Sequence, residues 1–394
     1  MHPFRRKYII KCDVCVTETD LGDGVFVQAG RNHGKACCQR GAKVASWPPE
    51  SSGIIRRKAG TMLSRRAFGI GLALMAGRLT PALAQSPTFF RIGTGSTAGT
   101  YYPIGSLLAT AISAPPGAPA CASDGACGVP GLVASALAST GSVANVSAIQ
   151  AGAVESGFVQ GDVAAWAYAG TGIWQNRPEA GKLRAIANLY PESIHLVVRQ
   201  DAGIGAVADL RGKRVSLDEE GSGSRVDARI ILAGAGLSET DIRPAYLKLD
   251  QASLKMQQGA LDAIFFVGGY PAAAVAELAS QLPLQILPID GEIADALIAR
   301  HRFFSRSTIP AGTYDGQEAA VATISIGAQW LTSADQPEPL IHAITAALWN
   351  ARTRRQLDTG HARGRDIRPD RALQGLAIPL HPGAERYYRE AGLL

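Results

Sequence analysis

The chain has 394 residues, of which 46% are hydrophobic and 18% charged, so it can build one large or two medium folded domains. Its net charge is +6, but residues 1–84 alone hold 14 Lys and Arg against 5 Asp and Glu. The rest of the chain is therefore mildly acidic, which argues against a nucleic acid as partner.

Residues 62–84 have the features of an export signal. Met62 suits a translation start, and a twin-arginine pattern at 64–68 precedes an apolar run at 68–77 that is too short to span a bilayer. Small residues at 82–84 provide a cleavage site. We expect a signal peptide cleaved after Ala84 and a periplasmic protein. We interpret residues 1–61 as an N-terminal extension that a mis-called start would explain, and their cysteines lack zinc-site spacing.

The first half of the remaining chain predicts strands that alternate with helices. An apolar strand at 89–95 runs into the loop 96–103, and a helix is expected over 104–113. After a loop that carries two cysteines, we expect a helix, a short strand and then a helix over 143–151. Strands are predicted at 157–160, 183–189 and 194–199, with a helix over 162–168 after the first of them.

The second half continues the same alternation. A strand that ends near residue 217 leads into the Gly/Ser loop 221–225 and a helix over 226–235. Further strands are expected at 245–249, 263–267, 284–288 and 321–327, and further helices at 253–259, 272–280, 293–300 and 338–350. This alternation predicts an α/β class with mostly parallel sheets. Polar or Gly-rich loops follow strands in both halves, and ligands bind at such strand ends.

Four segments carry a resemblance to a known family. The sequence Ile-Gly-Thr-Gly-Ser-Thr-Ala-Gly-Thr-Tyr-Tyr-Pro at 92–103 resembles the opening signature of the TAXI family, the extracytoplasmic solute-binding subunits of TRAP transporters. Residues 155–164 are similar to the family's second motif, with Gly161 where Ser is common. Segments 221–224 and 381–388 also match. The resemblance covers about residues 89–394.

The resemblance implies a two-lobed α/β periplasmic-binding-protein fold with crossing hinge strands, which we place near 194–199 and 321–327. Lobe one would comprise residues 86–195 and 325–394, and lobe two residues 196–324. The implied function is to capture a small organic anion, a carboxylate or an amino acid such as glutamate, and to deliver it to a TRAP permease driven by an ion gradient. We expect a monomer without cofactor or metal.

The candidate ligand-binding residues of lobe one lie in two loops. The first loop precedes a helix start, where free backbone N–H groups bind anions, and its candidates are Thr97, Gly99, Thr100, Tyr101 and Tyr102. The alternative is a Gly-rich turn whose aromatic side chains belong to the core. In the second loop, Gln160 would orient the ligand, and Asp162 would either contact it or cap the next helix.

The candidates of lobe two begin a helix or end a strand. Ser222, Ser224 and Arg225 suit an anion, with Arg225 as a bidentate clamp; the alternative is that Ser224 caps the helix and Arg225 is solvated. Phe266, Gly268 and Gly269 would form the pocket floor, and Phe266 is equally suited to the core.

Cys121 and Cys127 lie close together in one loop of an expected export product. They would form a disulfide that closes this loop, or remain two free thiols.

Two other classes of function, an enzyme and a sensor, compete with transport. The pattern Gly93-x-Gly95-x-x-Ala98 approaches a dinucleotide fingerprint, but a Pro-rich loop stands where its acidic partner is required. No nucleophile elbow or metal-ligand spacing is found either, so we predict that the protein is not an enzyme. A periplasmic sensor that presents its ligand to a membrane signalling protein stays open as the alternative.

Overall fold

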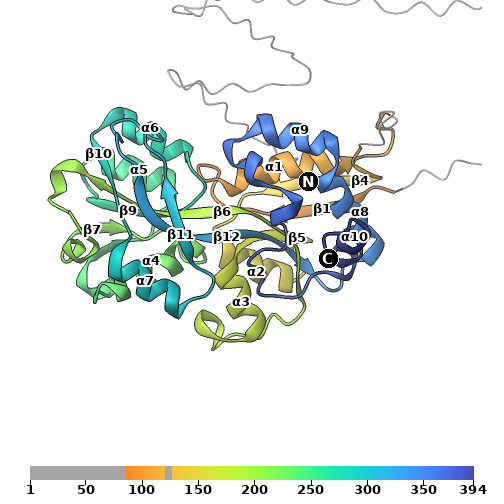
Figure 1. Cartoon of the computed structure of the whole chain (residues 1–394), viewed down its shortest axis with the longest axis horizontal. Coiled ribbons are helices and arrows are strands. Elements are labelled where there is room, and N and C mark those ends of the chain that lie inside the picture. The colour runs from red at the N-terminus through yellow and green to blue at the C-terminus, as the bar shows by residue number, and fades with distance from the viewer. Residues whose placement is uncertain (1–85, 120–126) are drawn as a thin grey trace, which may run out of the picture. The chain divides into compact units, whose positions relative to one another are not determined.

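A computed structural model describes residues 86–119 and 127–394 (Figure 1). The expected N-terminal extension, the signal peptide and Cys121 lie outside the described residues. Within the described ranges, no helix is long and apolar enough to cross a bilayer.

One mixed sheet runs through the described part of the chain. Its strands are β1 (Thr88–Gly93), β4 (Leu132–Leu137), β5 (Ser156–Gln160), β6 (Leu183–Arg199), β7 (Arg214–Ser216), β8 (Arg243–Ala245), β9 (Ala263–Gly268), β10 (Leu284–Leu287), β11 (Ser305–Ile309) and β12 (Val321–Ser333). Their order is β4-β1-β5-β12-β6-β9-β7-β8, with β10 beside β6 and β11 beside β12. A separate small sheet pairs β2 (Ser113–Ala114) with β3 (Val129–Pro130).

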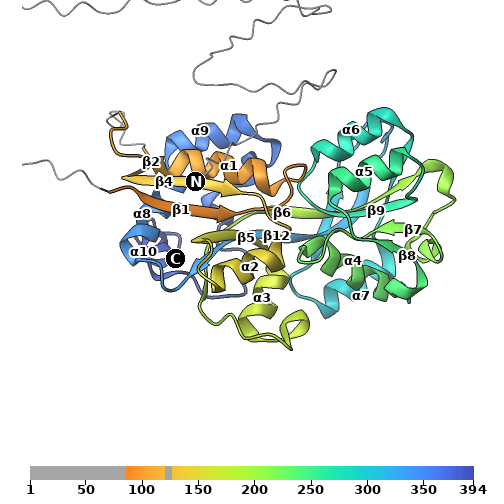
Figure 2. The same cartoon turned by 180° about the vertical axis from the view of Figure 1, so that it is seen from behind.

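Helices cover both faces of this sheet (Figures 1 and 2). They are α1 (Tyr101–Ile112), α2 (Ser142–Gln150), α3 (Gly161–Ala169), α4 (Gly223–Gly234), α5 (Leu249–Gln257), α6 (Ala273–Gln281), α7 (Gly291–Arg300), α8 (Glu338–Trp349), α9 (Ala351–Gly360) and α10 (Pro382–Glu390). Short 3-10 turns connect several of them.

The long strands β6 and β12 join two lobes. One half of β12 pairs with β5, while β9 and β10 pair with the far half of β6. We call the part around β1, β4, β5, α1–α3 and α8–α10 lobe one, and the part around β7–β11 and α4–α7 lobe two. Each has its own buried core, around Phe158 and Trp330 in lobe one and around Leu196 and Phe265 in lobe two.

This topology confirms the predicted two-lobed α/β fold with crossing hinge strands. The exact lobe boundaries expected from the sequence stay predictions. The sheet is mixed and not mostly parallel as predicted: the strands on the outer side of each lobe are parallel, but β6 and β12 pair antiparallel with each other and with their other neighbours.

Three local expectations were wrong. The strand expected at 245–249 keeps only Ala245, because β8 ends there and helix α5 begins at Leu249. The strands expected at 183–189 and 194–199 are one continuous strand, β6. Pro191 interrupts the β pattern in the sequence, but it lies where β6 changes neighbours, after the residues that bond to the 372–380 segment and before those that pair with β9. The helix expected after Gly131 is instead strand β4, whose six residues all pair with β1. Tertiary pairing there overrides the helix preference of Ala and Leu.

Candidate interlobe binding site

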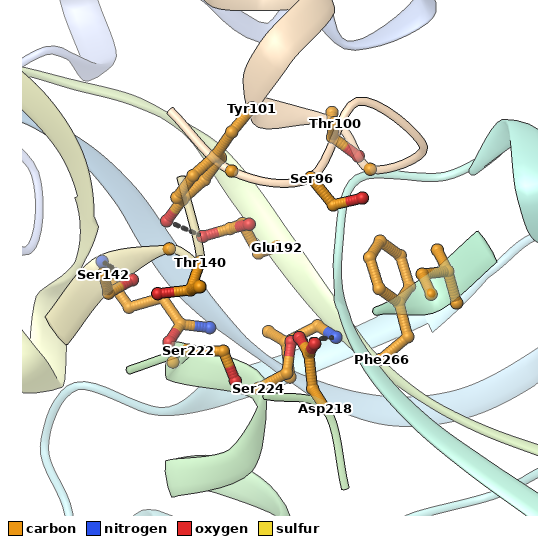
Figure 3. A pocket seen from close by; sticks show the side chains of 17 residues that line it. Ser96, Thr100, Tyr101, Thr140, Ser142, Glu192, Asp218, Ser222, Ser224 and Phe266 are labelled. Carbon is orange, nitrogen blue, oxygen red and sulfur yellow. Dashed lines mark hydrogen bonds between the residues drawn. The ribbon is translucent and has the colours of Figure 1, made fainter. Parts of the chain in front are cut away.

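A small cavity of about 60 Å³, open to solvent at its mouth, lies at the junction of the two lobes (Figure 3). The loops that precede α1 and α2 line it from lobe one, and the loop that precedes α4 and the end of β9 line it from lobe two. Strand β6 contributes Glu192 at the crossing between the lobes.

Four helices begin at this cavity. Thr100, Gly141, Gln160 and Ser222 are the N-cap residues of α1, α2, α3 and α4, and all four line it. The first N–H groups of a helix have no partner within the helix and carry a partial positive charge. The Ser222 hydroxyl accepts a hydrogen bond from the Arg225 N–H, whereas the other three N-caps make no such side-chain bond. The cavity therefore offers backbone donors from both lobes.

Two carboxyl groups face the same cavity (Figure 3). The Tyr101 hydroxyl donates to Glu192 Oε2 at 2.6 Å, and Glu192 is only 2% exposed. Burial, together with the nearby Asp162 carboxyl, raises the pKa of Glu192 to about 8, against the lowering effect of the Tyr101 hydrogen bond. Asp218, which follows β7 with a left-handed backbone (φ 72°), has its pKa raised by burial to about 6.

A pair of buried aspartates lies behind the cavity, one from each lobe. Asp162 in α3 and Asp227 in α4 are both fully buried. The Gln160 amide donates to Asp227 Oδ2 at 3.1 Å, while neither oxygen of Asp162 has a hydrogen-bond partner among the described residues. Burial raises the pKa of Asp162 to about 7 and, with the neighbouring Asp162 charge, raises that of Asp227 well above its usual range. Burial therefore favours the protonated form of both carboxyl groups.

The two lobes are in direct contact around the cavity. Thr100 Oγ1 donates to the Gly269 carbonyl at 3.1 Å, and the Ala144 N–H donates to the Gly221 carbonyl at 3.1 Å. Val226 of lobe two packs into a buried cluster formed largely by lobe one. The structure thus represents a closed arrangement of the lobes.

Seven of the residues predicted from the sequence line this cavity: Gly99, Thr100, Tyr101, Gln160, Ser222, Ser224 and Phe266. Their role in binding stays a prediction, but they come together from both lobes. Ser224 also has a structural role, because its hydroxyl accepts a hydrogen bond from the Val267 N–H at 3.2 Å.

The other predicted residues lie away from the cavity lining. Thr97 is exposed, and Tyr102 lies on a separate shallow surface depression. Arg225 pairs with Glu239 at 3.2 Å and stacks on the Tyr246 ring. Gly269 receives the Thr100 hydroxyl and packs against Arg363, and Gly268 sits beside the Phe266 ring. Asp162 is the buried partner of Asp227 described above.

Sequence reasoning missed several lining residues. They are Gly95, Ser96, Thr140, Gly141, Ser142, Glu192, Asp218, Gly223, Leu249 and Val267. Gly141 and Ser142 carried a usable signal, because they precede an expected helix in the same way as the Gly/Ser loop at 221–225. Glu192 lies between two expected strands, and the sequence around it carried no signal of a lining residue.

Two further predictions concern the pairing of the cysteines and the absence of a metal site. The cysteine pairing stays a prediction because Cys121 lies outside the described residues. Among the described residues, no group of three or more His, Cys, Asp or Glu is arranged to hold a metal ion.

Residues 92–392 match the NMT1-like family, and the chain belongs to it. The finer resemblance to TAXI subunits remains a prediction.

Solved structures of periplasmic binding proteins show a distant likeness. The periplasmic aliphatic sulphonate binding protein SsuA from Escherichia coli has 17% identity and a TM-score of 0.39, covering 77% of this chain and 79% of that chain. PhnD1 from Prochlorococcus marinus, in complex with methylphosphonate, has 12% identity and a TM-score of 0.46, covering 78% of this chain and 100% of that chain. Similarity at this level carries no information about the solute.

Proposed function

We propose that the protein is a periplasmic solute-binding protein that encloses a small polar molecule between its lobes and delivers it to a membrane permease. The observation that carries this proposal is the convergence of four helix N-caps, from both lobes, on one cavity. A solute held by donors from both lobes favours the closed arrangement over an open one by its differential affinity.

The hinge supports a mechanism of binding followed by closure. Strands β6 and β12 are the two long strands that pass between the lobes, and the pairing partners change along their length. Lobes joined in this way close by small backbone changes at the crossing. The closed form, with its Thr100–Gly269 contact complete, is then the form that a permease recognises.

The resemblance to TAXI subunits leads us to propose a TRAP permease as the partner and an organic acid or amino acid as the solute. Backbone N–H groups at the helix starts and the Ser222 and Ser224 hydroxyls are suitable donors for a carboxylate. We assign the cavity a role in binding and no catalytic step.

The test is calorimetry of the full chain with a panel of organic acids and amino acids. We expect at least one member to bind at micromolar affinity or tighter, and to raise the thermal midpoint. A ligand at 100 times its Kd stabilises by about 2.7 kcal/mol. Ser222→Ala is expected to weaken that binding and leave the fold intact. A panel in which nothing binds or stabilises would contradict the proposed function.

A further inference from the structure

The charges at the interlobe cavity do not suit a simple anion. Among the described residues that line it, Glu192 and Asp218 are the acidic side chains, and no Lys, Arg or His is present. Arg225, the cation that the sequence predicted as a ligand clamp, is engaged by Glu239 and Tyr246 instead. A ligand with only negative charge would meet two carboxyl groups without a side-chain cation to offset them.

The carboxyl of Glu192 is held in place with one oxygen still available. Oε2 accepts a hydrogen bond from the Tyr101 hydroxyl, and no hydrogen bond to Oε1 is present within the described part of the chain. In Figure 3, Glu192 and Asp218 approach the open centre of the cavity from different sides. A donor in the cavity therefore finds acceptors on two sides of it.

We propose that the solute carries a protonated amine, which binds at Glu192 and Asp218, and that its acidic or polar end faces the helix N-termini. This inference rests on the proposed function, and it narrows the solute to a cationic or zwitterionic class. An amine supplies the positive charge that is absent from the cavity lining, and N–H donors that the two carboxyl groups accept.

The experiment uses pairs of compounds that differ only in the amine. Calorimetry of the full chain at pH 7.5 would compare L-glutamate with glutarate, and L-leucine with 4-methylpentanoate. Putrescine provides an amine without a carboxylate. We expect a compound with an amine to bind at least tenfold more tightly than its partner without one.

Variants locate the amine. Glu192→Gln keeps the size of the side chain and an acceptor for Tyr101 but removes the charge, and Asp218→Asn keeps a residue that tolerates the left-handed backbone. We expect each to weaken binding of the amine compound at least fivefold. Glu277→Gln, an exposed glutamate of α6 outside the cavity, is the matched control and should change affinity less than twofold.

The outcomes separate the inference from the proposed function. If a deaminated acid binds as tightly as its amino partner, or Glu192→Gln binds it more tightly than the natural chain, the amine inference is wrong and the solute-binding function stands. If no compound of any class binds, the proposed function fails together with the inference. Because the compound pairs are tested on the unaltered chain, the result does not depend on how any variant folds.

Discussion

Carboxyl groups at the surface of this protein and those at its interlobe cavity lie in opposite environments, and their pKa values shift in opposite directions. On lobe two, Arg214 makes paired hydrogen bonds to Asp262, and this guanidinium lowers the pKa of that carboxyl. On lobe one, Arg354 does the same for Asp358. At the cavity, burial without a cation raises the pKa of Glu192.

This difference indicates where the protein gives up folding stability for the sake of function. A buried carboxyl without a cation is expensive, and well-packed neutral replacements are often as stable or more so. In the surface pairs, as is usual in proteins, a carboxylate lies beside a group of opposite charge. The cavity carboxyls become favourable only when something else brings the positive charge, which is the role that we propose for the solute.

The largest expected effect comes from Gly223→Ala. A Cβ at this position would lie 1.5 Å from Gln160 Oε1 and 2.8 Å from Ser142 Oγ, both in the other lobe. The clash arises only when the lobes are closed, so we expect the solute affinity to fall roughly 10- to 100-fold, as an overpacking cost of about 1–3 kcal/mol implies. Calorimetry measures the affinity.

The matched control is Gly181→Ala, because a Cβ there meets no atom within 4 Å and its backbone is not left-handed. It should leave affinity unchanged. An equal loss of affinity in both variants would show that the Gly223 effect does not come from lobe closure.

The next effect concerns the aspartate pair between the lobes. Because the folded-state pKa of Asp162 is raised from 3.8 to about 7, the fold keeps a proton that the unfolded chain releases. The stability that this group contributes is fully present below about pH 4 and is lost as the pH rises through about 7.

Asp227→Asn replaces one of the two buried ionisable carboxyls with a neutral amide and keeps an acceptor for the Gln160 amide. We expect it to raise the thermal midpoint at pH 8 by about 2–4 °C, corresponding to about 1 kcal/mol, and to have little effect at pH 4. Thermal melts of both proteins at the two pH values measure this difference. A midpoint that falls at pH 8 would mean that the pair is not destabilising when ionised.

The smallest effect is expected at the surface. Arg214→Gln breaks a partly exposed ion pair with Asp262, and such pairs contribute about 0.2–1 kcal/mol. We expect a small drop of the thermal midpoint that shrinks in high salt, and no change in solute affinity. A loss of affinity comparable to that of Glu192→Gln would remove the contrast between surface and cavity.

The sequence predicted those parts of the site that local patterns determine. The strand, Gly-rich loop and helix start around Gly99 and Thr100 form a contiguous pattern, and the structure places both residues at the cavity. The same holds for Ser222 and Ser224 at the start of α4. Helix periodicity separates Arg225 from them, because adjacent residues on a helix point about 100° apart.

The charges of the cavity depend on tertiary structure and were not predictable in the same way. Glu192 reaches the cavity only because β6 is continuous past Pro191, where two strands were expected. Asp162 and Asp227 are 65 positions apart in sequence, and only the contact between the lobes makes them neighbours. The sequence therefore led to an anion as solute, whereas the assembled cavity favours one with a positive charge.

The most direct test is a crystal structure of the full chain with the tightest-binding compound of the amino acid panel. We expect the solute between the two lobes, its amine within hydrogen-bond distance of Glu192 Oε1 and its carboxylate at the helix starts near Ser222. A solute bound elsewhere on the protein, or one whose carboxylate faces Glu192, would contradict this account.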